Sequence, residues 1–180
     1  IVTDGCLTGV TGNPSVDPGT RADGIAIGTS DPRAQGGFGD GSDADNPCLQ
    51  EGHLDTHGGQ PAGGLLTPGT AWQYVFGTTT RVQIKAKADA EVAAGLTDSA
   101  RTYIWVTSSS PYNQSWGSAT HPVILVFDAV ADCPRINGGP DIYGVVFVDS
   151  PCTANGLGGA HIYGSGIVNG GITGLNANTE

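Results

Sequence analysis

Three short apolar runs recur in the last third of the chain, with starts about 20 residues apart. They cover 123–129, 144–150 and 164–170, and in each the apolar residues lead into Asp or Asn followed by a small residue. The last two runs each begin with Gly, and in both cases the two residues before that Gly are Ile-Tyr. Such a period is typical of stacked coils in which each repeat buries the apolar face of its neighbour. We therefore predict a short β-solenoid-like repeat over 122–175, with three ordinary antiparallel strands of a sandwich as the alternative.

The middle of the chain also carries strand-like patterns. An apolar and aromatic run covers 71–76, period-two alternation covers 81–88, and a third apolar run covers 101–107. Strict alternation indicates a strand with one buried and one solvated face. Residues 89–96 have room for one or two helical turns, and 24–28 is a further short strand. We expect these strands to form an antiparallel lobe on which the repeat packs.

The first seventy residues are rich in Gly, Asp and Pro and contain few apolar anchors. A long irregular stretch inside a compact domain is normally functional, ligand-stabilised or disordered. We divide the chain into a loop-rich N-terminal arm and lobe (1–70), antiparallel strands (71–121) and the repeat region (122–180), together forming one compact unit. The predicted class is an all-β, disulfide-bonded fold with long Gly/Asp-rich loops.

Composition agrees with a turn-rich protein and excludes two classes of partner. The 180 residues include 30 Gly and 11 Pro and no Met, which is typical of an all-β chain. Seven basic against 17 acidic residues give a formal net charge of −10, so no basic patch exists to neutralise nucleic acid or an anionic membrane. No apolar run approaches the ~18 residues that a membrane span requires.

Four cysteines are present, and no two of them form a C-x-x-C pair. An even number in this arrangement favours disulfides in an oxidising compartment over a zinc site. Cys133 and Cys152 follow successive apolar runs, so we predict a disulfide between them that stabilises the fold by roughly 3 kcal/mol. We expect Cys6 to pair with Cys48, although sequence alone allows three connectivities. The start at Ile1 is consistent with a processed terminus, so we expect a secreted or cell-surface protein, or else a trimmed part of a larger one.

The repeat region carries a family resemblance. The segment Pro122–Gly174 contains P-V-I-L-V-F-D, I-N-G-G-P-D-I-Y-G-V-V-F-V-D and A-H-I-Y-G-S-G-I-V-N-G. It resembles the C-terminal repeat region of PilX-like type IV pilus assembly proteins and related bacterial surface proteins, over less than a third of the chain. Members of that group begin with a long apolar pilin helix, which this chain does not contain. The resemblance implies a structural role in an extracellular filament.

Two polar clusters in the first sixty residues have the composition of metal sites. Asp40, Asp43 and Asp45 lie in a Gly-containing loop, and calcium accepts carboxylate oxygens in irregular geometry. We predict weak calcium binding there, with a solvated acidic loop as the alternative. His53 and His57 flank a carboxylate at a spacing that transition metals use, but no third histidine or thiol is near.

No catalytic constellation can be assembled from the sequence. The chain lacks the G-x-S-x-G of a serine hydrolase. Asp128 and Asp149 end successive apolar runs, which indicates turn residues rather than the carboxylate pair of a glycosidase. We therefore expect no enzymatic activity and no cofactor other than calcium. Asn113 lies in an N-x-S sequence and is a candidate glycosylation site.

The ends of the chain indicate a structural subunit of an extracellular filament, pilus or surface layer. Ile1, Val2 and Thr3 are rich in β-branched residues, and a segment of this kind can add to the open sheet edge of a neighbour. Repeated head-to-tail addition between copies of the chain produces a fibre. The alternative is that this arm folds back onto its own domain, held by Cys6.

Two other functional classes remain as alternatives. The first is a secreted carbohydrate- or calcium-binding adhesive module that uses Trp72, Trp105 and Trp116 together with the acidic loop. Aromatic side chains are more often part of a core than platforms for a sugar. The second is a solenoid-type carbohydrate-active enzyme.

Overall fold

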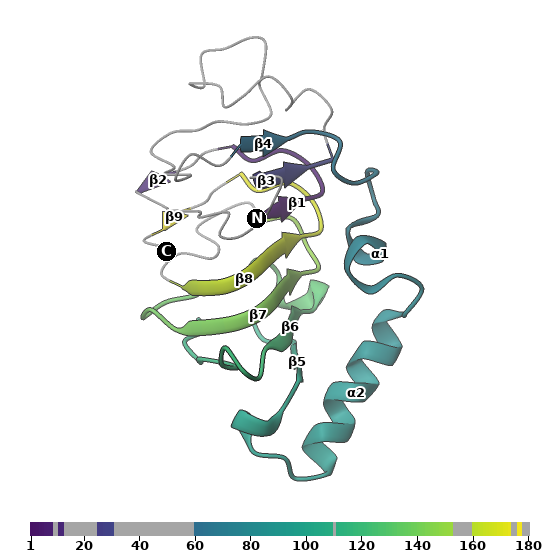
Figure 1. Ribbon diagram of the computed structural model, residues 1–180, viewed down its shortest axis with the longest axis vertical. Helices are drawn as coiled ribbons and strands as arrows, with labels where there is room; N and C mark the ends of the chain where they lie inside the picture. The colour runs from purple at the N-terminus through teal and green to yellow at the C-terminus, as the bar shows by residue number, and fades with distance from the viewer. Residues whose placement is uncertain are drawn as a thin grey trace.

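A seven-stranded parallel sheet, in the order β4-β3-β1-β8-β7-β6-β5, forms the body of the molecule (Figure 1). The computed structural model describes residues 1–8, 11–12, 25–30, 60–109, 111–152, 160–173 and 176–177. The strands of this sheet are β1 (Val2–Thr3), β3 (Ile25–Thr29), β4 (Gln60–Ala62), β5 (Tyr103–Val106), β6 (Val123–Phe127), β7 (Asp141–Val148) and β8 (His161–Val168). The remaining elements are β2 (Thr11–Gly12), which pairs with β9 (Asn176–Ala177), the helices α1 (Ala71–Phe76) and α2 (Arg81–Ala93), and the short 3-10 helices η2 (Asp98–Ala100) and η3 (Ala129–Ala131).

The predicted all-β class with an antiparallel lobe is wrong. Every strand pairing in the sheet is parallel, and the expected strands at 71–76 and 81–88 belong to α1 and α2. Thr80 begins α2 with a capping box, because its hydroxyl accepts from the backbone N–H of Gln83 while the Gln83 side chain accepts from Thr80 N–H. Ala, Lys, Gln, Glu and Arg then favour helix by intrinsic propensity. The apparent period of two has no structural counterpart, since α2 buries only Ile84 and Ala88, one turn apart.

The three apolar runs lie side by side as β6, β7 and β8. Val123 pairs with Gly144, which pairs in turn with Gly164, and the register continues without a shift to the ends of the strands. Neighbouring strands therefore carry equivalent residues of the 20-residue period at equivalent positions. Since successive strands are parallel, the chain has to return between them, and the described residues of these returns, such as Trp116 and Ile136, pack on the face of the sheet away from α1 and α2.

β1 lies in the middle of the sheet, between β3 and β8. Val2 and Thr3 pair with β3 on one side and with β8 on the other, and both residues are buried. The arm at Ile1 therefore folds back onto its own domain, which was the alternative considered for it. Both edges of β1 are paired within its own sheet, so in this structure the strand is not available for addition to a neighbouring subunit.

A disulfide joins Cys133 to Cys152, which confirms the pairing predicted from their positions after successive runs. It connects the segment that follows β6 to the segment that follows β7, and Cys152 is fully buried. Cys6 is also disulfide-bonded, and Cys48 lies outside the described residues.

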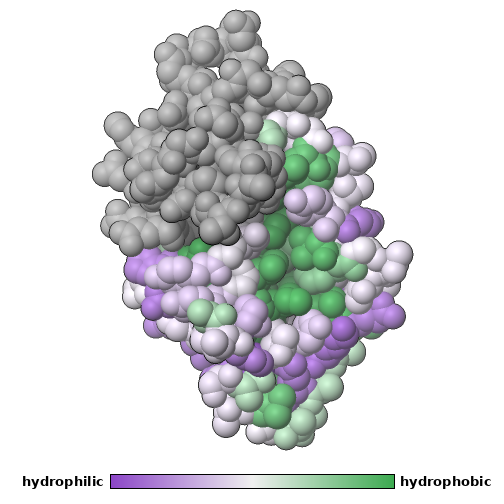
Figure 2. Space-filling model, viewed as in Figure 1, coloured by the Kyte–Doolittle hydropathy of each residue, from purple (hydrophilic) through white to green (hydrophobic). Residues whose placement is uncertain are grey.

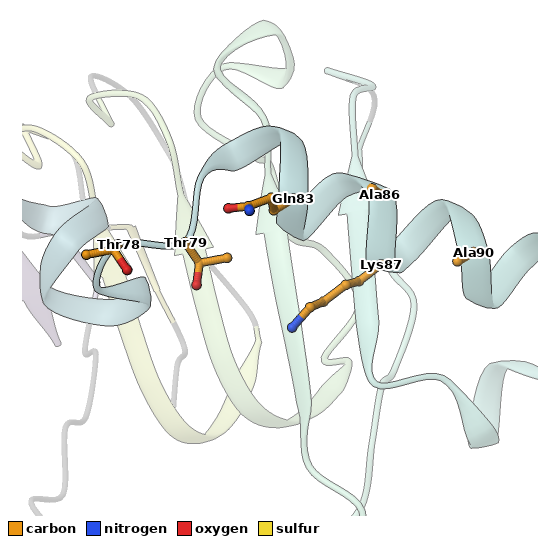
Figure 3. A pocket seen from close by; sticks show the side chains of 6 residues that line it. All are labelled: Thr78, Thr79, Gln83, Ala86, Lys87 and Ala90. Carbon is orange, nitrogen blue, oxygen red and sulfur yellow. The ribbon is translucent and has the colours of Figure 1, made fainter.

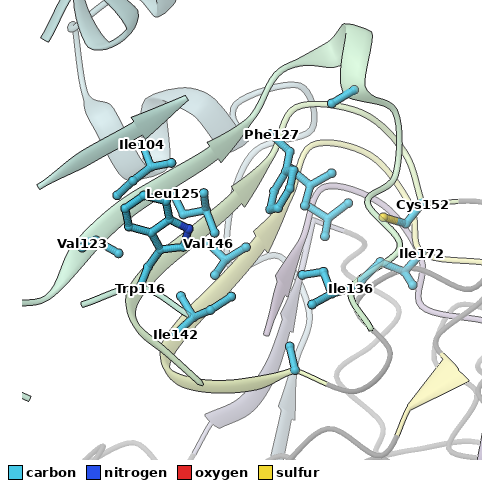
Figure 4. Packing of buried hydrophobic residues seen from close by; sticks show 14 of the residues in the cluster. Ile104, Trp116, Val123, Leu125, Phe127, Ile136, Ile142, Val146, Cys152 and Ile172 are labelled. Atoms are coloured by element: carbon cyan, nitrogen blue, oxygen red, sulfur yellow. The ribbon is translucent and has the colours of Figure 1, made fainter. Parts of the chain in front are cut away.

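The larger apolar cluster lies between the inner face of the sheet and the segments that return across it (Figure 4). The strands and the returning segments both contribute fully or almost fully buried side chains, which gives the sheet a continuous core on this side. Figure 4 labels members of two kinds. The strands contribute Ile104, Val123, Leu125, Phe127, Ile142 and Val146, and the returning segments contribute Trp116, Ile136, Cys152 and Ile172.

Candidate functional site

The outer face of the sheet, opposite the inner core, carries the candidate site. Because side chains alternate between the two faces of a strand, the register places Tyr103, Ile124, Val145 and Ser165 in one row across β5, β6, β7 and β8. Tyr143 and Tyr163 occupy the preceding row on β7 and β8. We call these six residues the outer strip.

The outer strip contains a stacked pair of tyrosines. The ring centroids of Tyr143 and Tyr163 lie 4.4 Å apart with an interplanar angle of 14°, and 51% of Tyr163 is exposed. Next to them, Nδ1 of His161 lies 3.0 Å from Oδ1 of Asp141. Flat aromatic surface and hydrogen-bonding groups therefore lie together on one exposed part of the sheet.

The two helices cover the adjoining part of the same face. Trp72 and Phe76 of α1 pack edge-on against Phe147, at 5.2 and 5.4 Å between ring centroids, and Trp72 also contacts Trp105. Figure 2 shows apolar side chains gathered between the strands and α1. This outer cluster fixes the position of α1 over the sheet.

The three tryptophans that the adhesive-module alternative would use as sugar platforms are buried or half-buried in the structure. Trp72 and Trp116 are each 5% exposed, and they belong to the outer and inner clusters respectively. Trp105 is half-buried and donates its indole N–H to Asp128 Oδ2 at 3.0 Å. The structure therefore brings tyrosines, and not these tryptophans, together on an exposed surface.

A row of polar residues follows the carboxyl ends of the central strands and holds the helices in place. Asp4 follows β1, and its two carboxylate oxygens accept from the backbone N–H groups of Gly69 and Ala71 at the start of α1. Asp128 follows β6 and accepts from Val130 N–H, as expected for a turn residue. These carboxylates are therefore engaged in local structure.

Asp149, which follows β7, is the most buried member of this row, with 7% of the residue exposed. Both of its oxygens accept from the guanidinium of Arg81 in the first turn of α2, and Asn169 donates to Oδ1 at 2.8 Å. The hydrogen bond to Asp149 raises the pKa of Arg81 above its ordinary value, against the opposing effect of burial. A bidentate charged pair of this kind fixes both distance and orientation, so it fastens α2 to the end of β7.

A groove of about 600 Å³ runs along α2 on the side of the α1–α2 connection (Figure 3). In Figure 3 the Lys87 side chain extends from α2 towards the strands, while Gln83 points back towards the beginning of the helix, where its amide oxygen accepts from Thr80 N–H. Lys87 Nζ lies 3.3 Å from the hydroxyl of Tyr103 and 4.8 Å from the centre of its ring. The lining residues are Thr78, Thr79, Gln83, Ala86, Lys87 and Ala90. Since Tyr103 belongs to the outer strip, the groove and the strip share a boundary.

The predicted metal residues Asp40, Asp43 and Asp45 lie outside the described residues, as do His53 and His57. Within the part of the chain that the structure describes, no three His, Cys, Asp or Glu side chains form a group that could hold a metal ion. Asn113 is exposed, so its side chain is accessible at the surface. In the same described ranges, no helix has the length and apolar character needed to cross a membrane.

The tyrosine pair had a signal in the sequence that was not used for function. Ile-Tyr-Gly occurs twice, 20 residues apart, and a repeat of that length in stacked strands places identical residues beside one another. The groove had no such signal, because it depends on where α2 lies over the sheet. No protein-family model matches this chain, and comparisons with curated proteins and with solved structures also find no match.

Proposed function

We propose that this protein is a carbohydrate-binding adhesive module of an extracellular surface. The observation that carries the proposal is the stacked pair Tyr143 and Tyr163 on the outer face of the sheet, where Tyr163 is 51% exposed and Tyr143 is half-buried. The apolar faces of sugar rings pack on aromatic rings, while their hydroxyl groups need nearby hydrogen-bonding partners such as His161, Asp141 and Ser165. The disulfide between Cys133 and Cys152 fits an oxidising, extracellular setting.

Replacing both tyrosines by alanine is expected to weaken binding to neutral oligosaccharides about five- to thirtyfold, from the loss of ~1–2 kcal/mol of aromatic packing. A neutral-glycan array identifies the ligand, and isothermal titration of that ligand measures the change. Tyr74→Ala is the matched control, because Tyr74 is 45% exposed on α1 and lies outside the outer strip. Equal affinity of the double variant and the wild type, or no binding to any neutral glycan, would contradict the proposal.

A second candidate function is a structural subunit of an extracellular filament, pilus or surface layer. The observation that favours it is the unbroken register of β6, β7 and β8 together with the disulfide that joins the segments after β6 and β7, since both make the sheet rigid. Assembly through the β5 edge is disfavoured, because Glu91 of α2 accepts the backbone N–H groups of Thr102 and Tyr103 there, each at 2.9 Å.

Negative-stain microscopy of native material separates the two candidates. A filament subunit is expected to appear as fibres containing copies of the chain, whereas an adhesive module is expected to appear as separate particles that retain glycan binding. Separate particles at all protein concentrations tested would exclude the filament.

A further inference from the structure

Lys87 differs from the other cations on or beside α2. Arg81 pairs with Asp149, Lys85 with Asp89, and Arg101 with Asp98. Lys87 makes no ion pair with any carboxylate of the described residues, and its contact there is the phenol of Tyr103. In a chain with a formal net charge of −10, Lys87 is therefore a cation in the lining of the groove whose charge no described carboxylate neutralises, and an anionic group of a ligand can pair with it.

The surroundings of Lys87 suit a small ligand with both polar and apolar surface. Thr78 and Thr79 contribute hydroxyl groups to the groove, and Gln83 contributes an amide whose oxygen already accepts from Thr80. Ala86 and Ala90 form the apolar part of the lining without filling the space. One ammonium with a few neutral donors and acceptors does not match a dense anion such as phosphate, which is normally bound by several charges or backbone N–H groups.

We infer that the groove along α2 binds an acidic sugar residue, whose carboxylate pairs with Lys87 and whose hydroxyl groups bind Thr78, Thr79 and Gln83. This inference rests on the proposed carbohydrate-binding function and adds the charge of the ligand to it. The outer strip meets the groove at Tyr103, so a glycan that stacks on Tyr143 and Tyr163 can place an acidic unit beside α2. The acidic protein repels long polyanions, but a single carboxylate at Lys87 interacts within the screening length of about 8 Å at physiological ionic strength.

The test compares methyl β-D-glucuronide with methyl β-D-glucoside, which differ at the carboxylate. NMR titration of the wild type is expected to show at least tenfold tighter binding of the glucuronide, with the preference decreasing as salt is added. Lys87→Gln removes the charge at similar length and is expected to abolish the preference. Lys85→Gln is the matched control, since Lys85 lies two residues away on the exposed surface and pairs with Asp89, and it is expected to retain the preference.

Three outcomes would overturn the inference. They are equal binding of the two glycosides by the wild type, equal effects of the Lys85 and Lys87 substitutions, and no binding of glucuronide by a protein that still binds neutral glycans through Tyr143 and Tyr163. The last outcome leaves the proposed function intact. If neutral glycans also fail to bind, the inference and the proposed function both fall.

Discussion

Replacing Gly144 by alanine is expected to lower the free energy of unfolding by about 3–5 kcal/mol, which places it among the most damaging single substitutions. A Cβ on Gly144 would overlap the carbonyl of Val123 on β6 and lie 2.6 Å from the Val123 nitrogen. The backbone at Gly144 also has φ of 132°, a conformation that L side chains rarely adopt. Neither strand can move away without breaking the register of the sheet. Gly164→Ala is expected to behave in the same way, since its Cβ would lie 2.8 Å from the Gly144 carbonyl carbon.

Gly166→Ala supplies a matched control on β8, the strand that carries Gly164 and pairs with β7. The nearest atom to a Cβ there is Ile162 Cδ1 at 4.0 Å, so the added methyl group fits. Urea unfolding followed by circular dichroism should give the control a midpoint close to that of the wild type, while Gly144→Ala unfolds at much lower urea. If Gly144→Ala and Gly166→Ala were equally stable, the close approach of β6 and β7 at this position would be incorrect.

Asp149→Ala is expected to detach α2 from the end of β7, with a loss of about 2–4 kcal/mol. The carboxylate is buried and accepts from Arg81 and Asn169, so its removal leaves two sets of donors without their partner. Arg81 also lies 4.5 Å above the ring of Trp72, and loss of its anchor should loosen the aromatic cluster beneath α1. Urea unfolding gives the stability, and the near-ultraviolet dichroism of the tryptophans reports the packing of α1.

The control for Asp149 is Asp89→Ala. Asp89 pairs with Lys85 on the exposed surface of α2, where such a pair contributes less than about 0.5 kcal/mol. A double-mutant cycle between Asp149 and Arg81 isolates the pair itself. Similar losses for Asp149→Ala and Asp89→Ala, or a coupling energy near zero, would show that α2 is held by other contacts.

The period of the C-terminal runs could be predicted from the sequence, but the direction of the strands stayed open between a solenoid-like stack and the antiparallel strands of a sandwich. Apolar composition and turn residues are the same for a parallel and an antiparallel neighbour, and the path of the returning chain decides between them. One copy of the signal was also missed. Residues Ile1–Gly5 read I-V-T-D-G, which matches the endings of the later runs, and they form β1 and the residues that follow it. Ile1–Gly5 corresponds only to the end of a repeat, so a comparison with the complete later runs does not reveal it.

The alternating pattern of 81–88 predicts a strand, whereas the capping box at Thr80 and the helix propensity of the residues after it favour the helix α2. In 81–88 the apolar members Val82, Ile84, Ala86 and Ala88 satisfy a period of two, yet Val82 is 77% exposed. The sequence Thr-x-x-Gln before an Ala-rich stretch was the better evidence. α1 was harder to predict, since its six residues are apolar and aromatic and are stabilised as a helix by Asp4 and the sheet beneath them.

The place of β1 between β3 and β8 also has a kinetic consequence. Val2 pairs with Ile167, so β1, which is made before the other strands of this sheet, finds one of its neighbours only after more than 160 further residues have been made. Closing so long a loop is entropically slow, and contacts between distant parts of a sequence correlate with slow folding. Until β8 is made, the β-branched residues of β1 have an unpaired edge, which is the state in which strands aggregate. The pairing of β1 with β8 is therefore among the last contacts of the sheet to form, and a chaperone that binds the residues of β1 during synthesis would protect the protein while that edge is unpaired.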